Sequence, residues 1–215
     1  MKTILFDLDG TLVNSEEGIT KCAQYALEAF GIHEPDLKKL RFFIGPPLID
    51  TFQEKYGMSR ETAAEATAKY RERYNPIGIY ECELYEGVEE LLRSLKHKGY
   101  RIGMASSKPE VSCRKLLTHF QIAQYFDEVA GATMDGKINS KIEVLNEAIR
   151  RMHLTKLSDV VLIGDTRFDV LGAKEAGIDC IGVSFGFGTT EELEAGGAVC
   201  ICDNIREVED YIERW

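Results

Sequence analysis

Two aspartates stand at the end of an apolar segment near the start of the chain. The sequence opens MKTILFDLDGTLVNS, where a run of apolar residues reads as a buried strand that Asp7 interrupts and Asp9 follows. Because strand side chains alternate, positions 7 and 9 are expected to point the same way. Two buried carboxylates are costly, and each raises the pKa of the other unless a cation lies between them. The sequence therefore predicts a cation-dependent site at this end of the strand.

Further polar residues follow other predicted strands. Ser106 and Ser107 come at the end of one strand, Asp165 ends another, and Asp169 lies four residues later at the start of a helix. Open α/β sheets bind ligands at the carboxyl ends of their strands, so we expect these residues to meet the two N-terminal aspartates at one edge. Four clustered aspartates call for a hard divalent cation. Mg²⁺ suits them, because it takes one or two carboxylates and completes its shell with water and substrate phosphate.

The elements that position these residues alternate from Gly87 onwards. We expect helices over 87–98, from Pro109, over 141–152, over 168–176 and at the C-terminus, and strands over 100–106, 126–130, 160–165, 179–184 and 199–202. Alternating strands and helices imply an α/β fold with a doubly wound parallel sheet and right-handed crossovers.

Residues 15–82 contain only helical patterns. Helical spacing runs over 15–30 and 48–56, and Ser59 is placed to cap a helix that ends near Tyr74. We therefore expect a catalytic core formed by residues 1–14 and 83–215, with residues 15–82 inserted as an all-helical cap.

The composition limits the partners of the chain. Its 215 residues carry a formal net charge of -10, which argues against binding to nucleic acid polymers or anionic membranes. No apolar run approaches the roughly 20 residues of a membrane span, and the N-terminus shows no signal-peptide pattern. The six cysteines are scattered without a C-x-x-C pair, which favours reduced thiols in a cytoplasmic protein over a zinc site.

Four stretches together resemble a known superfamily. DLDGTLVNS, the serine of MASSK, a loop lysine and GDTRFD resemble, in this order, the four motifs of the haloacid dehalogenase superfamily. The similarity covers nearly the whole chain and includes a helical cap after the first motif, as in members similar to phosphoglycolate phosphatase or β-phosphoglucomutase. RFFIGPPLIDTF and VSFGFGTTEEL look most like the group that contains phosphoglycolate phosphatases and 5'-nucleotidases.

The resemblance implies roles for the first and fourth motifs. Asp7 matches the nucleophile that forms an aspartyl-phosphate, and Asp9 matches the general acid and base. The family's Mg²⁺ is held by the Asp7 carboxylate, the backbone carbonyl of Asp9 and the carboxylate that matches Asp165. Gly10 would allow a close backbone approach. For DLDGT alone, the alternative is a strand followed by an Asp-Gly turn.

The second motif implies a phosphate site. Ser106 matches the hydroxyl that binds the transferring phosphoryl group, and Ser107 is a further candidate for phosphate binding. The alternative is that Ser106 caps the helix that begins at Pro109, a task that Ser107 or Lys108 could share.

The third motif implies a lysine that offsets Asp7 and the phosphoryl oxygens. Lys141 matches it best because it begins the helix before VVLIGD, and Lys137 is the local rival. Ile142 stands where the family often has proline, and a surface charge is the alternative for either lysine. Asp169 is expected to orient Lys141 or a metal-bound water, or to act as a favourable charge in the first turn of a helix.

The cap is less informative. Gly45, Pro46 and Pro47 either form a loop that reaches the site or mark the start of a helix. Arg71 and Arg73 meet either an anionic substrate group or solvent. The four histidines receive no role.

Together these features predict a Mg²⁺-dependent phosphatase that acts on a small phosphorylated metabolite, such as phosphoglycolate or a nucleoside monophosphate, as a monomer or homodimer. A phosphomutase is the alternative with the same machinery, and a non-catalytic binding or regulatory module is the alternative of another class. A dehalogenase is disfavoured, since it needs neither Mg²⁺ nor an acid at position 9.

Overall fold

The computed structural model describes residues 2–215 and contains two compact units. The larger unit consists of the residues up to Val13 together with Leu84–Trp215, and the smaller unit is Asn14–Glu83. The chain passes between them through β2 (Val13–Asn14) and β3 (Glu83–Leu84), which form a two-stranded sheet.

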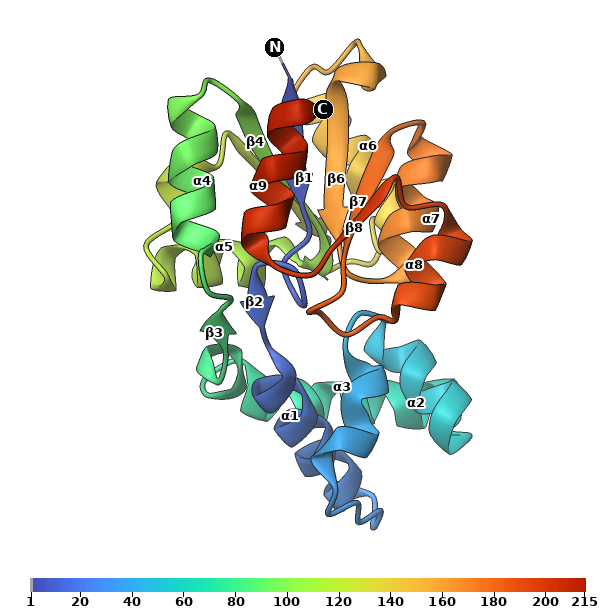
Figure 1. The fold of residues 1–215 in the computed structure, drawn as a ribbon. Coiled ribbons are helices and arrows are strands. Elements are labelled where there is room, and N and C mark those ends of the chain that lie inside the picture. Colours follow the sequence, from blue (N-terminus) through green and yellow to red (C-terminus); the bar gives the residue numbers. More distant parts are fainter. Residues whose placement is uncertain (1) are drawn as a thin grey trace. The chain divides into compact units, whose positions relative to one another are not determined.

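The larger unit is built on a six-stranded parallel sheet with the order β5-β4-β1-β6-β7-β8 (Figure 1). The strands are β1 (Thr3–Phe6), β4 (Arg101–Pro109), β5 (Glu128–Ala132), β6 (Val160–Gly164), β7 (Asp179–Val183) and β8 (Cys200–Cys202). Every residue of β1 is buried, and β1 pairs in parallel with β4 on one side and β6 on the other. This central place explains its continuous apolar sequence, since strands covered on both faces lack alternation. The predicted doubly wound sheet is confirmed.

Helices cover the sheet of the larger unit. They are α4 (Val88–His97), α5 (Glu110–His119), α6 (Lys141–Arg151), α7 (Arg167–Ala176), α8 (Thr190–Gly196) and α9 (Ile205–Arg214). Helix α4 packs against β4 and α9, whereas α6 packs against β4, β5 and α7. Figure 1 shows α4 and α9 in front of the sheet and α6 behind it. The apolar faces of α6 and α7 form one buried cluster with β1 and β6.

Two predicted boundaries in this unit were wrong. Strand β4 continues to Pro109 instead of ending at position 106, because its pairing with β5 resumes at Pro109 after a register shift that begins at Ser106. Strand β5 lies two residues later than expected. Helix α8 was not predicted, because its seven residues are too few to show a helical period.

The smaller unit is helical. It contains α1 (Glu16–Ala29), α2 (Leu48–Tyr56), α3 (Arg60–Tyr74) and two 3₁₀ segments at Leu37–Phe43 and Gly78–Tyr80. Helix α1 packs against α3 and against the first 3₁₀ segment. Ser59 caps α3 as predicted, since its side chain accepts a hydrogen bond from the Thr62 amide.

Arg73 is held inside the smaller unit. Its guanidinium donates two hydrogen bonds to the Glu81 carboxylate, at 2.7 and 3.0 Å, and a third to Cys22 Sγ at 3.2 Å. The alternative of a solvated side chain was therefore wrong for Arg73, because the half-buried Glu81 carboxylate, beyond the end of α3, provides a bidentate partner. Arg71 is exposed. Pro47 directly precedes α2, so at least part of the Gly-Pro-Pro segment marks a helix start.

None of the helices within residues 2–215 combines the length and the apolar character that a bilayer crossing requires.

Candidate active site

The loop after β1 positions Asp7. The pairing of β1 with β6 continues one residue past the strand, because the Asp7 amide donates to the Ile163 carbonyl at 2.9 Å. The chain then turns back sharply: Val13 donates to the Leu8 carbonyl at 3.0 Å, and Gly10 has a φ of 82°, which other residues rarely adopt. Asp7 is therefore fixed at the carboxyl end of the central strand, with its side chain buried.

Lys141 provides the positive charge nearest to Asp7. Its Nζ lies 2.6 Å from Asp7 Oδ1 and 2.8 Å from Asp169 Oδ1, and it donates a hydrogen bond to the Ala105 carbonyl at 3.0 Å. The Lys141 side chain is only 7% exposed. A buried ammonium with two hydrogen-bond acceptors and a second carboxylate at 2.8 Å is well compensated and held in one orientation.

The start of α6 directs Lys141 inwards. Ser140 and Glu143 form a capping box that fixes the first turn of the helix. The Lys141 stem lies against Gly172 of α7, where a Cβ would stand 2.7 Å from Lys141 Cγ. Lys137 is 83% exposed and pairs with a neighbouring aspartate instead, so the structure brings Lys141 and not Lys137 to Asp7.

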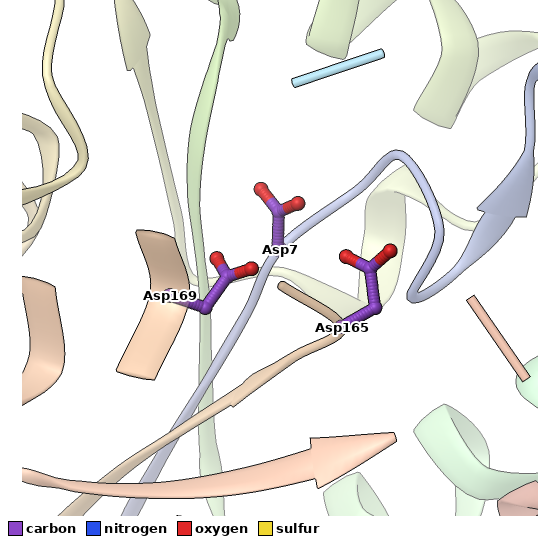
Figure 2. A group of neighbouring side chains, drawn as sticks. All are labelled: Asp7, Asp165 and Asp169. Atoms are coloured by element: carbon purple, nitrogen blue, oxygen red, sulfur yellow. The ribbon is translucent and has the colours of Figure 1, made fainter. Parts of the chain in front are cut away.

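Three buried carboxylates gather beside this lysine. Asp7, Asp165 and Asp169 each offer an oxygen, and these oxygens all lie within 4.8 Å of one another. Figure 2 shows the three side chains, which come from the loop after β1, the end of β6 and the first turn of α7. Asp169 Oδ2 also accepts hydrogen bonds from the Thr166 amide at 3.0 Å and the Thr166 hydroxyl at 2.7 Å. Asp169 thus completes the capping box of its helix and contacts Lys141, and its role in orienting Lys141 stays a prediction.

A glycine-rich loop after β7 encloses Asp165. The Phe187 amide donates to Asp165 Oδ2 at 2.8 Å. Gly10, Gly186 and Gly188 approach so closely that a Cβ on any of them would collide with Asp165. No role in the site was predicted for this loop. Its signal is the spacing of glycines in SFGFG, which becomes informative only when the loop is known to face Asp165.

The electrostatics of the group are unbalanced. Burial raises the pKa of Asp7 to about 6, with a contribution from Asp169 and against the attraction of Lys141. Burial and the charges of Asp169 and Asp7 raise the pKa of Asp165 well above its usual value. Burial opposes the charge of Lys141, but the two aspartates that it contacts outweigh burial and raise its pKa.

This donor set fits a divalent cation. Three carboxylates share one ammonium, so the group carries excess negative charge in a buried place. Asp169 Oδ1 receives no aligned hydrogen bond there, although Lys141 Nζ lies 2.8 Å away. Carboxylate oxygens are the ligands that Mg²⁺ prefers, and an ion would relieve the repulsion that raises the pKa values.

Asp9 lies apart from this group. Both of its carboxylate oxygens accept hydrogen bonds from Lys108 Nζ, at 2.8 and 2.9 Å. The expectation of a cluster of four carboxylates was therefore wrong, because the Asp9 carboxylate pairs with Lys108 instead, although its charge still acts on Asp7. Strand β1 ends at Phe6, so strand alternation does not extend to position 9, and the ammonium of Lys108 draws the side chain to β4.

Ser106 lies at the carboxyl end of the sheet next to β1. Its side chain is buried, and its Oγ accepts a hydrogen bond from the Lys108 amide at 3.3 Å. The capping alternative was wrong, because α5 begins after Pro109 without a side-chain cap. Ser107 follows on the same strand and is half-buried. The phosphate-binding roles of both serines remain predictions.

Comparison with known proteins identifies the family of this site. The model of the haloacid dehalogenase-like hydrolases matches residues 4–183, which include every motif residue described above. The chain belongs to this family. The resemblance inferred from the four motifs is thereby confirmed, and the protein is an enzyme of the hydrolase class.

Relatives of this hydrolase act in phosphate chemistry. A 5'-nucleotidase of Pseudomonas aeruginosa is 40% identical over 210 residues, which cover 98% of this chain and 95% of the relative. A phosphoglycolate phosphatase of Vibrio parahaemolyticus is 27% identical, over an alignment that covers 99% of this chain and 96% of the relative. The tyrosine-protein kinase PtkA of Mycobacterium bovis is 36% identical over 89% of this chain, which spans 65% of that protein.

The fold of this hydrolase is also found in solved structures. A crystal structure of a predicted phosphatase from Clostridium acetobutylicum is 41% identical, covers 100% of this chain and 99% of its own, and superposes with a TM-score of 0.96. The family, the phosphatase relatives and this fold together support a phosphatase function for the chain.

Proposed function

We propose that the chain is a Mg²⁺-dependent phosphatase that hydrolyses a small phosphomonoester through an aspartyl-phosphate on Asp7. The observation that carries this proposal is the buried Asp7 carboxylate at the end of β1, with an ammonium 2.6 Å away and two further carboxylates beside it. A carboxylate held in this way can act as a nucleophile toward phosphorus, because the neighbouring positive charge counters the repulsion of the anionic substrate.

The reaction has two half-reactions. In the first, an Asp7 oxygen forms a bond to phosphorus, the bond from phosphorus to the leaving oxygen breaks, and Asp9 gives that oxygen a proton. In the second, a water oxygen attacks phosphorus, Asp9 takes the proton of the water, and the bond to Asp7 breaks. Inorganic phosphate leaves and both aspartates return to their starting states.

Other side chains of the site hold the reactants. Lys141 keeps its charge beside Asp7 and faces the phosphoryl oxygens once Asp7 has become an ester, with Asp169 fixing its direction. Ser106 and Ser107 are proposed to bind the same oxygens. The carboxylates of Asp7 and Asp165 and the carbonyl of Asp9 would hold Mg²⁺, which when bound neutralises charge on the phosphoryl group.

The substrate class follows from the smaller unit and from the relatives. We propose that residues 14–83 act as a cap that closes over a small leaving group and excludes water. A nucleoside 5'-monophosphate is the first candidate, since the 5'-nucleotidase relative is 40% identical and the phosphoglycolate phosphatase relative is 27% identical. No disulfide joins the cysteines within residues 2–215, which agrees with the cytoplasmic location that we propose.

The test is a comparison of kcat/KM for phosphate release across five substrates with Mg²⁺ present. We expect nucleoside 5'-monophosphates and phosphoglycolate to exceed a phosphotyrosine peptide and an oligonucleotide with a terminal phosphate by at least about tenfold, with p-nitrophenyl phosphate as the generic ester. The net charge of -10 adds a global repulsion against the oligonucleotide.

Each other outcome would favour a different function or a different role for residues 14–83. A peptide or oligonucleotide that outperforms the small esters would contradict the role proposed for residues 14–83. Transfer of phosphate between positions of one sugar without release would favour a phosphomutase. An absence of turnover on every ester would favour a binding module.

A further inference from the structure

Lys108 and Asp9 form a second buried ion pair beside the pair of Lys141 and Asp7. Lys108 Nζ lies within 2.9 Å of both Asp9 oxygens, and the two side chains are only 6% and 12% exposed. Burying two charges is costly, and the cost is offset only when the geometry is good. Each of the two aspartates assigned to the chemistry thus has its own ammonium, from a different element.

The backbone of Lys108 is fixed by groups next to the site. Its amide donates to Ser106 Oγ at 3.3 Å, and its carbonyl accepts a hydrogen bond from Cys113 Sγ at 3.6 Å. Lys108 lies where the pairing of β4 with β5 shifts register, between Ser106 and Pro109. A bulge of this kind changes the direction of a side chain. Here the Lys108 ammonium contacts the Asp9 carboxylate.

We infer that Lys108 is a positioning residue that holds Asp9 in the direction required for proton transfer. This inference rests on the proposed function. An ionised carboxylate accepts from the ammonium with both oxygens. When one oxygen carries the proton, the other can still accept from Lys108. One anchored oxygen therefore fixes the direction of the other in both half-reactions.

The geometry supports a need for such an anchor. Asp9 lies beyond the end of β1, and its backbone is held by an isolated bridge to Val13 in place of the strand pairing that holds β1 on both sides. The Asp7 carboxylate is close enough for its charge to interact unfavourably with that of Asp9. Without Lys108, the Asp9 side chain is free to turn away, and small displacements of a reacting group have large effects on rate.

The test compares Lys108→Met with wild type on two esters. Proton donation matters for an alkyl phosphate, such as a nucleoside monophosphate, and matters little for p-nitrophenyl phosphate, whose phenolate leaves without a proton. The second half-reaction is the same for both esters, so the comparison uses kcat/KM, which reports the first half-reaction alone. We expect Lys108→Met to lower kcat/KM about 10–100-fold for the alkyl ester, and less than about threefold for p-nitrophenyl phosphate. Lys137→Met, at an exposed lysine, is the matched control and should leave both rates unchanged.

A double variant separates action through Asp9 from direct contact with substrate. If Lys108 acts through Asp9, adding Lys108→Met to Asp9→Asn should cost almost nothing further. An equal loss of kcat/KM on both esters, or losses that multiply in the double variant, would overturn the inference. If Lys108→Met does not fold, Lys108→Gln provides the comparison, because its amide keeps one donor to Asp9. Its loss of activity should be smaller and should still be greater on the alkyl ester than on p-nitrophenyl phosphate.

The failure of this inference is distinguishable from failure of the proposed function. A wild-type protein without turnover on either ester would reject the phosphatase proposal. A different pattern would reject only the role of Lys108. In that pattern the wild type is active, Asp9→Asn loses more activity on the alkyl ester than on p-nitrophenyl phosphate, and the Lys108 variant loses the same on both.

Discussion

Asp7→Asn should lower phosphatase turnover more than about a thousandfold while the protein stays folded. An amide is a poor nucleophile toward phosphorus and a weak ligand for Mg²⁺, so the substitution removes both proposed tasks of Asp7. Its shape matches that of aspartate, so packing at the end of β1 is kept. The measurement is kcat for the best small ester under saturating substrate and Mg²⁺, with acid-quench trapping of a phosphorylated protein in the wild type.

The stability of the variant provides an independent check. Burial raises the pKa of Asp7 from 3.8 to about 6, so the folded state disfavours the ionised form by about 3 kcal/mol once the pH exceeds both values. Asparagine removes this cost, and Lys141 keeps Asp169 as its partner. We therefore expect metal-free Asp7→Asn to melt no lower than the wild type at pH 8. Asp135→Asn, at an exposed loop aspartate, is the control. Near-normal turnover in a folded Asp7→Asn protein would refute the mechanism.

Much of this site was predictable from residue types at strand ends. Asp7 and Asp165 both follow apolar runs, and parallel strands bring their carboxyl ends to one edge of the sheet. Lys141 was separable from Lys137 because it opens a helix, where the first turn of α6 has a fixed direction toward the sheet. In each case a regular strand or helix sets the position of the side chain, and the sequence pattern predicts that strand or helix.

The contacts of the site that the sequence could not predict are made by loops and by an irregular stretch of strand. The direction of Asp9 depends on a turn after β1 and on the register shift in β4 that presents Lys108. The amide of Phe187 reaches Asp165 from a loop without a periodic pattern. Such contacts join segments far apart in sequence through single side chains or amides, and no local propensity encodes them.

Removal of divalent cations should abolish turnover, and added Mg²⁺ should restore it. Asp7, Asp165 and Asp169 place three buried carboxylates around one ammonium, a charge balance that disfavours a bound anionic ester unless a cation is present. Ca²⁺ should inhibit, because it prefers bonds of about 2.3–2.6 Å and more ligands than Mg²⁺ and would misplace Asp7. The measurement is phosphate release after chelation and after titration with each ion. Full activity in excess chelator would contradict the proposed metal site.

Thermal melting tests the same site without reference to activity. A ligand that binds only the folded state raises the melting temperature, and protons compete with metal for carboxylates. The pKa of Asp7 is raised to about 6, so Asp7 gains a proton as the pH falls toward 5. The pKa of Asp165 also lies well above its usual value, which makes protons stronger competitors of the metal there. We therefore expect saturating Mg²⁺ to raise the melting temperature clearly at pH 8 and much less at pH 5. Asp165→Asn should reduce the shift at pH 8, whereas Asp135→Asn should keep it. An equal shift at both pH values would mean that Mg²⁺ binds elsewhere, because a site of ordinary surface carboxylates keeps its negative charge between pH 5 and pH 8.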